Sequence, residues 1–408
     1  MTTIWQYLND FSEISFHTPG HKGKIPFEIK DITEIEGSDN FCCPTGIIKN
    51  SQDMMAEALG KGAAFFLVNG ASSGITASIL ALTTENDTVL VDRNCHSSVI
   101  NGLILSGAMP RYIYPEYNTE FGVPLPVKSL NYNNEKMVII TTPTYYGDTA
   151  DVKSLKEQCG AAILFCDEAH GAHFYFSDRL TTPYTADISV ISFHKTMPAL
   201  NQGAVLSLGN SESLHSNVIK QGINIMSTSS PSYPIMASLD YSRIYGREIY
   251  NNPEIEAEIT DVRRNFGVYN NDDFYKILIN CEEPYYVNQK LLEKYNINSE
   301  GVFGNNILFM LSPCNTKSEI TVLKKALSEI KNSKKESFYA PPHLETALTP
   351  REAFYAEGEI IDAKNAIGRI SKENITEFPP CVPIVTIGEK ITTDILPFIK
   401  RKNIHVVK

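Results

Sequence analysis

Six short apolar runs, separated by segments of helical character, constrain the fold of this chain more than any other feature. Most of them are continuously apolar rather than alternating, which is typical of strands buried on both faces of a parallel sheet. Alternation of such strands with helices predicts an open α/β sheet, whose ligands bind beyond the carboxyl ends of the strands. The runs are Ala63–Asn69, Thr88–Asp92, Met137–Thr142, Ala161–Cys166, Asp187–Ser192 and Gly203–Leu208, and the expected helices include Gly74–Leu82, Ser97–Ser106 and Asp151–Cys159.

The pattern changes in the last third of the chain. Glu319–Lys331 has apolar residues at helical spacing with Lys and Glu between them, which predicts an amphipathic helix covering a small sheet. Strands are expected on either side of it, at Asn306–Leu311 and Pro383–Ile387. We therefore expect an N-terminal arm over residues 1–44, a large domain over 45–260 and a smaller α+β domain over 261–408.

Composition excludes several classes of partner. The chain has 408 residues and a net charge of −11, and an acidic surface does not attract nucleic acid or an anionic membrane. Met1–Phe11 lacks the basic and apolar regions of a signal peptide, and no stretch is apolar for the roughly 18 residues of a membrane span. The eight cysteines form no CxxC pair, so we expect reduced thiols, no metal site and a cytoplasmic protein.

Asp167 and Lys195 are the strongest candidates for catalysis. Each comes just after the end of an expected buried strand, Asp167 in CDEAHGAH and Lys195 in SFHKT. An enzyme that uses pyridoxal phosphate needs a lysine amine to hold the aldehyde and a carboxylate to keep the pyridine nitrogen protonated. An aspartate or lysine at a strand end is also common in α/β proteins without this cofactor.

A run of small residues, VNGASSG, follows the first strand and opens a helix. The helix N-terminus and the hydroxyls of Ser72 and Ser73 can hold a phosphate, while Ala71 and Gly74 leave room for it. A tight turn with an N-cap serine explains the same residues without a ligand.

Three histidines accompany these segments. His96 follows a strand in VDRNCHSS, where its ring can stack on a planar ligand. His170 can hydrogen-bond Asp167, and His194 directly precedes Lys195. A lone histidine such as His96 is more often a capping or core residue, and structural packing explains His170 and His194 equally well. The phosphate turn, histidine, aspartate and lysine nevertheless come in the order that a pyridoxal-phosphate site of this architecture requires.

At this point the chain resembles the prokaryotic ornithine/lysine/arginine decarboxylase family, which uses pyridoxal phosphate on an aminotransferase-like (fold type I) α/β fold. The resemblance covers nearly the whole chain, and HTPGHKG and SFHKT together are its most specific parts. The segments that carry it are SFHTPGHKGK, PTGIIKNSQ, VNGASSG, VDRNCHSS, TTPTYYGD, CDEAHGAH, SFHKTMPALNQGAVL, STSSPSYPIMASLD and TPREAFYAEGE.

The resemblance implies a role for each candidate residue. Lys195 would hold the cofactor as a Schiff base, Asp167 would pair with the pyridine nitrogen and His96 would stack on the ring. His170 would support Asp167 or the ring. The cofactor phosphate would be surrounded by Ser72, Ser73, Ser192 and His194, and by Thr228 and Ser229 reaching over from the neighbouring subunit of a homodimer.

The implied reaction is decarboxylation of arginine, lysine or ornithine to the amine, as in polyamine biosynthesis. Lys195 and His194 are both candidates for the proton donor, and the substrate stays open. We hypothesise that Glu352 and Glu357 contact the distal end of the substrate. Transamination or β-elimination on the same fold and a non-catalytic member are the alternatives.

Two features depart from the family pattern. Relatives usually carry histidine near Cys42 and Cys43, which puts substrate or subunit contacts there in doubt. The N-terminal wing domain of the large inducible enzymes is not found, so the chain resembles the short members of the family, and a decamer is not implied.

Overall fold

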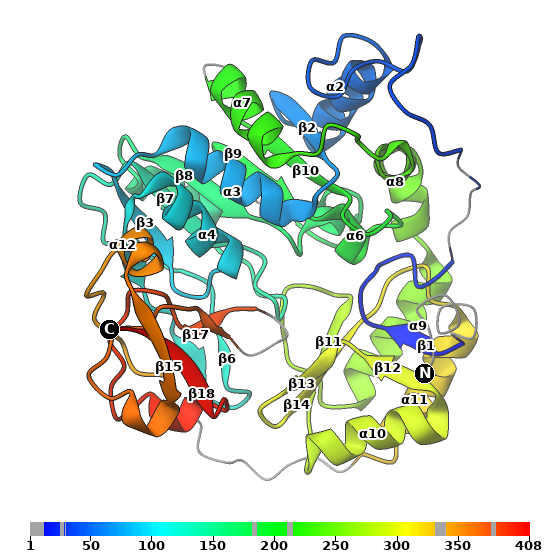
Figure 1. Ribbon diagram of the computed structural model, residues 1–408. Coiled ribbons are helices and arrows are strands. Elements are labelled where there is room, and N and C mark those ends of the chain that lie inside the picture. Colours follow the sequence, from blue (N-terminus) through cyan, green and yellow to red (C-terminus); the bar gives the residue numbers. More distant parts are fainter. Residues whose placement is uncertain are drawn as a thin grey trace, which may run out of the picture.

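The computed structural model describes residues 12–24, 28, 30–181, 186–209, 215–330, 340–376 and 381–408. Residues 1–11 of the expected arm and Lys331 of the expected helix lie outside the described residues. A large domain forms one half of the molecule, and two smaller units lie side by side below its sheet in Figure 1. Among the helices in the described ranges, none is long and apolar enough to cross a membrane.

A seven-stranded sheet in the order β2-β10-β9-β8-β7-β3-β4 forms the centre of the large domain. Strands β4, β3, β7, β8 and β9 are parallel, and β10 runs antiparallel to both of its neighbours, which confirms the mainly parallel α/β class. The bounds are β2 Ala63–Leu67, β3 Thr88–Asp92, β4 Met109–Ile113, β7 Met137–Thr141, β8 Ile163–Asp167, β9 Ile188–Ile191 and β10 Ala204–Leu208. Strand β4 was not predicted, because Pro110 and Arg111 interrupt its apolar pattern.

Helices cover both faces of this sheet. Val89 and Val91 of β3 pack toward α3 and α4, while Leu90 between them packs toward α5. Successive side chains of a strand point to opposite faces, so a strand buried on both faces must be continuously apolar. The helices are α2 Ile47–Leu59, α3 Gly70–Leu82, α4 Ser97–Ser106, α5 Val152–Gln158, α7 Ser216–Met226 and α8 Tyr233–Tyr250.

The first smaller unit is built on a three-stranded antiparallel sheet in the order β11-β14-β13. Helix α11 has a capping box formed by Thr316 and Glu319. Strand β1 (Ile14–Phe16) pairs in parallel with β12, which joins the N-terminal arm to this unit. Its elements are α9 Pro253–Asn265, β11 Lys276–Asn280, α10 Pro284–Tyr295, β12 Ile297–Ser299, β13 Gly301–Phe303, β14 Asn306–Met310 and α11 Lys317–Leu327.

The second smaller unit follows residue 340 and has its own apolar cluster, which includes Ile375, Val385 and Ile404. Strand β15 pairs with β18 and β16 with β17. Both strands expected on either side of α11 are present, as β14 and β17, but they belong to different sheets. Arg93 of the large domain binds the carbonyls of Pro383 and Ile384 and holds β17 there. The elements are α12 Pro350–Tyr355, β15 Gly358–Asp362, β16 Ile375–Thr376, β17 Pro383–Val385 and β18 Asn403–Val407.

The predicted domain boundary at residue 260 falls inside α9. A continuous helix is not a linker between domains, so we propose to place this boundary before Pro253. The separate apolar cluster after residue 340 divides the remainder into a small domain and a C-terminal unit.

Candidate active site

Two neighbouring parallel strands bring Asp167 and Lys195 to the same edge of the large sheet. Asp167 is the last residue of β8 and lies beside Val190 of β9. Ser192 then stands at the N-cap position of the short helix α6 (Phe193–Thr196), which contains Lys195. The arrangement follows from the sequence, because parallel strands end at one edge and short polar segments follow both of them.

The electrostatics of this pair depend on burial. The Asp167 side chain is only 2% exposed, and burial raises its pKa while the charge of Lys195 acts in the opposite direction. Burial also lowers the pKa of Lys195, an effect that Asp167 and Glu300 oppose. A lysine with a lowered pKa is more often an uncharged amine, which is the nucleophilic form.

His170 contacts Lys195 directly. Its Nε2 lies 2.9 Å from Lys195 Nζ. The expected hydrogen bond from His170 to Asp167 is not formed; an oxygen of Asp167 accepts the backbone N–H of Ala169 at 3.0 Å instead. The His170 ring packs edge-on against Tyr145, with ring centroids 5.0 Å apart. Its Nδ1 is buried and has no hydrogen-bond partner within the described part of the chain.

His96 is both a helix cap and a neighbour of Lys195. Its Nδ1 accepts the N–H of Ser98 at 3.1 Å, at the start of α4. Burial, with a smaller contribution from the charge of Lys195, lowers the pKa of His96 to about 4. The capping role and the proximity to Lys195 are therefore compatible, and the imidazole is neutral at physiological pH.

The proposed phosphate region is assembled from three loops. Gly70, at the start of α3, donates its N–H to the carbonyl of Gln202 at 2.9 Å, and His194 donates to Gly203 at 3.1 Å. Ser192 Oγ lies 3.1 Å from His194 Nδ1. Gly70 has a φ of +80°, a conformation that glycine adopts at little cost. The N-terminus of the 13-residue helix α3 thus lies beside the segment that carries Lys195.

The remaining candidates for phosphate contacts differ in exposure. Ser72 is exposed, whereas Ala71 is buried and Ser73 turns its hydroxyl back to the carbonyl of Gly70 at 2.8 Å. Thr228 and Ser229 lie on the surface beyond α7, where Thr228 Oγ1 accepts the N–H of Ser230 at 3.1 Å. No contact within the described residues joins Thr228 or Ser229 to Lys195 of the same chain.

The HTPGHKG segment crosses directly over α6. Gly20 donates its N–H to the carbonyl of His194 at 2.9 Å, and its carbonyl accepts Ser312 Oγ at 2.6 Å. The buried Lys22 amine binds the carbonyls of His17 and Met310 at 2.6 and 2.7 Å. The N-terminal arm therefore connects the lysine segment to the small domain.

Sequence reasoning missed Glu300 as a site residue. Its carboxylate accepts hydrogen bonds from the hydroxyl of Tyr145 at 2.7 Å and from the N–H of Thr18 at 2.9 Å. Its charge opposes the lowering of the Lys195 pKa by burial. Tyr145 was part of a recognised motif, but Glu300 stands between two short strands of another unit with no local signal. Glu352 and Glu357 are occupied elsewhere, Glu352 in the capping box of α12 and Glu357 with Lys408.

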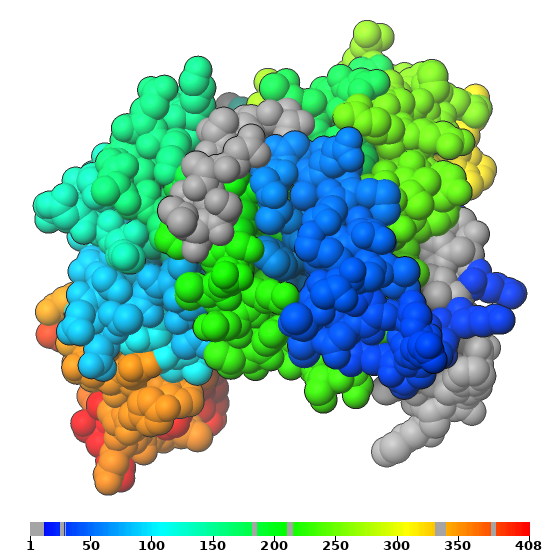
Figure 2. Space-filling view, turned by 90° about the horizontal axis from the view of Figure 1, so that it is seen from above, coloured from blue at the N-terminus to red at the C-terminus, as the bar shows by residue number. Residues whose placement is uncertain are grey.

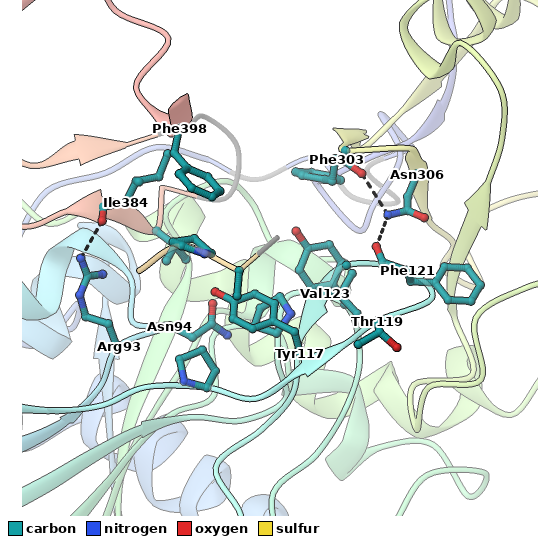
Figure 3. A pocket seen from close by; sticks show the side chains of 18 of the residues that line it. Arg93, Asn94, Tyr117, Thr119, Phe121, Val123, Phe303, Asn306, Ile384 and Phe398 are labelled. Carbon is teal, nitrogen blue, oxygen red and sulfur yellow. Dashed lines mark hydrogen bonds between the residues drawn. The ribbon is translucent and has the colours of Figure 1, made fainter. Parts of the chain in front are cut away.

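A cavity of about 600 Å³ adjoins this centre without containing Lys195 or Asp167. Figure 3 shows that it lies between the β5–β6 hairpin (Tyr117–Asn118 and Val123–Pro124), the small domain and the C-terminal unit. Phe303 and Tyr146 line it, and both pack against Tyr145, whose ring contacts His170. These aromatic rings therefore connect the cavity lining to His170 and, through His170, to Lys195.

The residues at the strand ends fit pyridoxal phosphate. An amine and a buried carboxylate are close enough for each to shift the pKa of the other, and neutral His96 lies near the amine. The N-terminus of α3 supplies backbone N–H groups for an anion beside His194. Lys195 would hold the aldehyde, Asp167 the ring nitrogen, and Ser72, Ser73, Ser192 and His194 the phosphate.

Comparison with known proteins points to one group. The family described as Orn/Lys/Arg decarboxylase, major domain, matches residues 1–280. The arginine decarboxylase of Bacillus subtilis (strain 168) is 32% identical over 95% of this chain and 90% of its own length, and that of Halalkalibacterium halodurans is 30% identical over 96% and 90%. The solved Escherichia coli constitutive lysine decarboxylase has the same fold, with a TM-score of 0.76, 17% identity and coverage of 91% of this chain and 74% of that one.

Proposed function

The chain belongs to the Orn/Lys/Arg decarboxylase family, and from that membership we propose that it decarboxylates arginine at a site built on Lys195 and Asp167. It is a pyridoxal-phosphate enzyme that decarboxylates a basic amino acid. The choice of arginine is supported by relatives named arginine decarboxylase, which align over about 90% of their length. A relative named lysine decarboxylase aligns over 37% of its length.

One observation carries the assignment of the site: Lys195 and Asp167 lie at the same sheet edge, and each shifts the pKa of the other. When bound, pyridoxal phosphate supplies an electron-withdrawing ring that accepts the electron pair left by departing carbon dioxide. Asp167 would keep the ring nitrogen charged, since a buried carboxylate strongly favours a nearby cation. His96, neutral with a pKa of about 4, would cover the ring without adding charge.

Lys195 is the stronger candidate for the proton donor after carbon dioxide leaves. His170 Nε2 lies within hydrogen-bond distance of its amine, at 2.9 Å, and thereby restricts where the amine points. His194 is less suited, because burial lowers its pKa to about 4 and its Nδ1 already faces Ser192 and Gly203.

We assign Glu300 to the cationic end of the substrate. Each carboxylate oxygen has two lone pairs, and each oxygen of Glu300 accepts one hydrogen bond, from Tyr145 or from Thr18. Both oxygens can still accept N–H groups, so a guanidinium can bind in the bidentate manner that arginine prefers.

We further propose a cytoplasmic homodimer that supplies a precursor of polyamines. An apolar face on α2 and α7 supports the dimer: the side chain of Ile225 is 69% exposed and that of Ile47 52%. In such a dimer Thr228 and Ser229, exposed beyond α7, would reach the partner's cofactor phosphate.

The test is a substrate panel on the cofactor-loaded enzyme. Carbon dioxide release is measured from arginine, lysine and ornithine, together with the products of transamination and elimination. We expect arginine to give the highest kcat/KM, and Lys195→Ala to release no carbon dioxide while it keeps its fold. For Glu300→Gln we expect the KM for arginine to rise on the order of 10- to 100-fold, because a hydrogen-bonded charge pair is lost.

Glu116→Gln is the matched control, since Glu116 pairs with Lys128 on the surface and its loss should leave KM unchanged. If lysine or ornithine gave a higher kcat/KM than arginine, that amino acid would replace arginine as the proposed substrate. Transamination or elimination products without carbon dioxide would overturn the proposed reaction, and an enzyme without any visible cofactor absorption would indicate a non-catalytic member.

A further inference from the structure

A buried group of three charged or titratable residues lies where the large domain meets the small domain. His173 is 1% exposed, Asp273 0% and Lys276 2%. His173 Nε2 is 3.0 Å from Asp273 Oδ1, and Lys276 Nζ is 3.8 Å from Asp273 Oδ2. The proposed reaction uses none of them. We call these residues the His173–Asp273–Lys276 cluster.

The cluster holds the chain segment that follows Asp167. His173 lies one turn after His170 along the chain, in the 3₁₀ helix Ala172–Tyr175. Its hydrogen bond to Asp273 therefore attaches the His170 turn to the segment that leads into β11 of the small domain. Movement of Asp273 would move the turn that carries His170.

The same small-domain residues also hold the loop on the other side of His170. Lys276 Nζ donates to the carbonyl of Thr144 at 3.1 Å, and the Asp273 N–H donates to the carbonyl of Gly147 at 2.9 Å. Between these points lies Tyr145, whose ring packs on His170. A Cβ at Gly147 would come within 2.9 Å of the Cβ of Asp273, so the backbone of the Tyr145 loop packs directly against Asp273 at this point.

Stability alone does not account for this arrangement. Two charges taken from water into the interior incur a desolvation cost that can exceed their attraction, and an apolar pair of similar volume would be about as stable. A hydrogen-bonded ionic group does, however, fix one relative position of the segments that it joins. Here it joins the two segments that flank His170.

We propose that Asp273 and Lys276 are positioning residues of the catalytic centre: they hold the His170 turn and the Tyr145 loop so that His170 Nε2 faces the Lys195 amine. The proposal rests on the proposed function only in naming Lys195 as the catalytic amine. The small domain thereby contributes to the state of Lys195 without touching it.

The test uses the full-length cofactor-loaded enzyme and three variants: Lys276→Met, Asp273→Asn and the double variant with both changes. The first readout is the pH titration of the visible absorption of the bound cofactor, which reports the surroundings of Lys195. The second is the separate measurement of kcat and KM, and the third is the melting temperature. The charged or titratable groups that face Lys195 and His170 are Asp167, Glu300, Lys276, Tyr145, His96, His173, His194 and Cys381. Apart from the substituted residues, all variants share these groups.

We expect the double variant to fold, because it removes both charges of the Asp273–Lys276 pair and so leaves neither of them buried without its partner. Its titration midpoint should differ measurably from that of the wild type, and kcat should fall on the order of 10- to 100-fold, with a smaller change in KM, because His170 is misplaced. Lys324→Met is the control: Lys324 pairs with Glu258 and Asp261 on the surface of the same domain, so its titration and kcat should match the wild type.

Two changes at His173 cover the case in which the double variant does not fold. His173→Gln keeps an N–H donor for Asp273, and His173→Leu removes it without adding a charge. We expect the glutamine variant to keep the wild-type midpoint and the leucine variant to shift it. A wild-type midpoint and kcat in the leucine variant, or in a folded double variant, would overturn the proposal. The absorption titration needs no substrate, so failure of the arginine assignment would not be mistaken for this result.

Discussion

At the scale of single residues, the catalytic centre around Lys195 contains few charged groups and several uncharged imidazole rings. The pKa of His96 and that of His194 are both lowered to about 4, and burial also lowers the pKa of His170. These imidazoles stay neutral at physiological pH, which leaves Lys195 and Asp167 as the titratable pair at the strand ends. In a buried site the interaction of such a pair is strong, since little water screens it.

The first prediction concerns Asp167. Asp167→Ala should still bind the cofactor through Lys195, but kcat should fall by about 100- to 1000-fold, the usual effect of removing one preorganised electrostatic partner. Carbon dioxide release measures kcat, and visible absorption shows that the cofactor is bound.

The control for this substitution is Asp187→Asn. Asp187 is a buried carboxylate just before the amino end of β9, where it accepts the N–H of Leu164 at 2.7 Å, far along the strand from Lys195. Its loss should lower the melting temperature without changing kcat. Equal turnover of Asp167→Ala and the wild type would exclude Asp167 from the reaction.

The sequence predicts residues at strand ends better than residues from distant units. Asp167 and Lys195 could be proposed because a buried strand and a polar turn are both local patterns. Glu300 could not, because its place beside Tyr145 and Thr18 depends on the docking of the small domain. The pairing of His170 with Lys195 rather than Asp167 likewise depends on side-chain orientation, which no pattern specifies.

At the scale of elements, six of the seven strands of the large sheet were predicted to within two residues, and only β4 was missed, since continuous apolar runs leave little choice of strand bounds. In the C-terminal unit only β17 was predicted, within the expected strand Pro383–Ile387. Strand β16 has two residues, too few to show a period. Their partners are set instead by contacts with Arg93 and by the local apolar cluster.

The N-terminal arm gives a prediction at this scale. A Cβ at Gly20 would lie 2.5 Å from the backbone carbon of Thr196, in the helix that carries Lys195. Gly20→Ala should therefore push the arm away from α6, lower the melting temperature and reduce kcat. Overpacking of this kind costs about 1 to 3 kcal/mol, measurable by urea unfolding.

Gly23→Ala separates this contact from backbone strain. Gly23 has a φ of +75° and open space around its Cβ position, so alanine there introduces strain of about 1 kcal/mol without a collision. We expect Gly23→Ala to keep kcat. If Gly20→Ala kept the same kcat as Gly23→Ala, the contact between the arm and α6 would have no catalytic role.

At the scale of the whole molecule, three units surround one centre. The small domain supplies Glu300, the large domain supplies Lys195, and the C-terminal unit is tied to the end of β3 by the buried pair Arg93–Glu389 at 2.9 Å. Figure 2 shows, from above, that α7 and the segment leading into α2 lie together on one face; Asn224 Nδ2 donates to the carbonyl of Cys42 at 3.1 Å there. Cys42 and Cys43, the departure from the family pattern, belong to this face.

The last prediction tests whether this face joins two subunits with shared sites. Thr228→Asp would place a carboxylate against the partner's cofactor phosphate, and Lys195→Ala removes the catalytic amine, so each variant alone should be inactive. In a mixed dimer, one of the two sites combines an intact Lys195 with an intact Thr228 from the partner. Equal mixing and subunit exchange should therefore restore about a quarter of wild-type carbon dioxide release, given a symmetric dimer with random pairing. An active Thr228→Asp variant, or a mixture that stays inactive after exchange has been verified by mass, would show that Thr228 does not act across the interface.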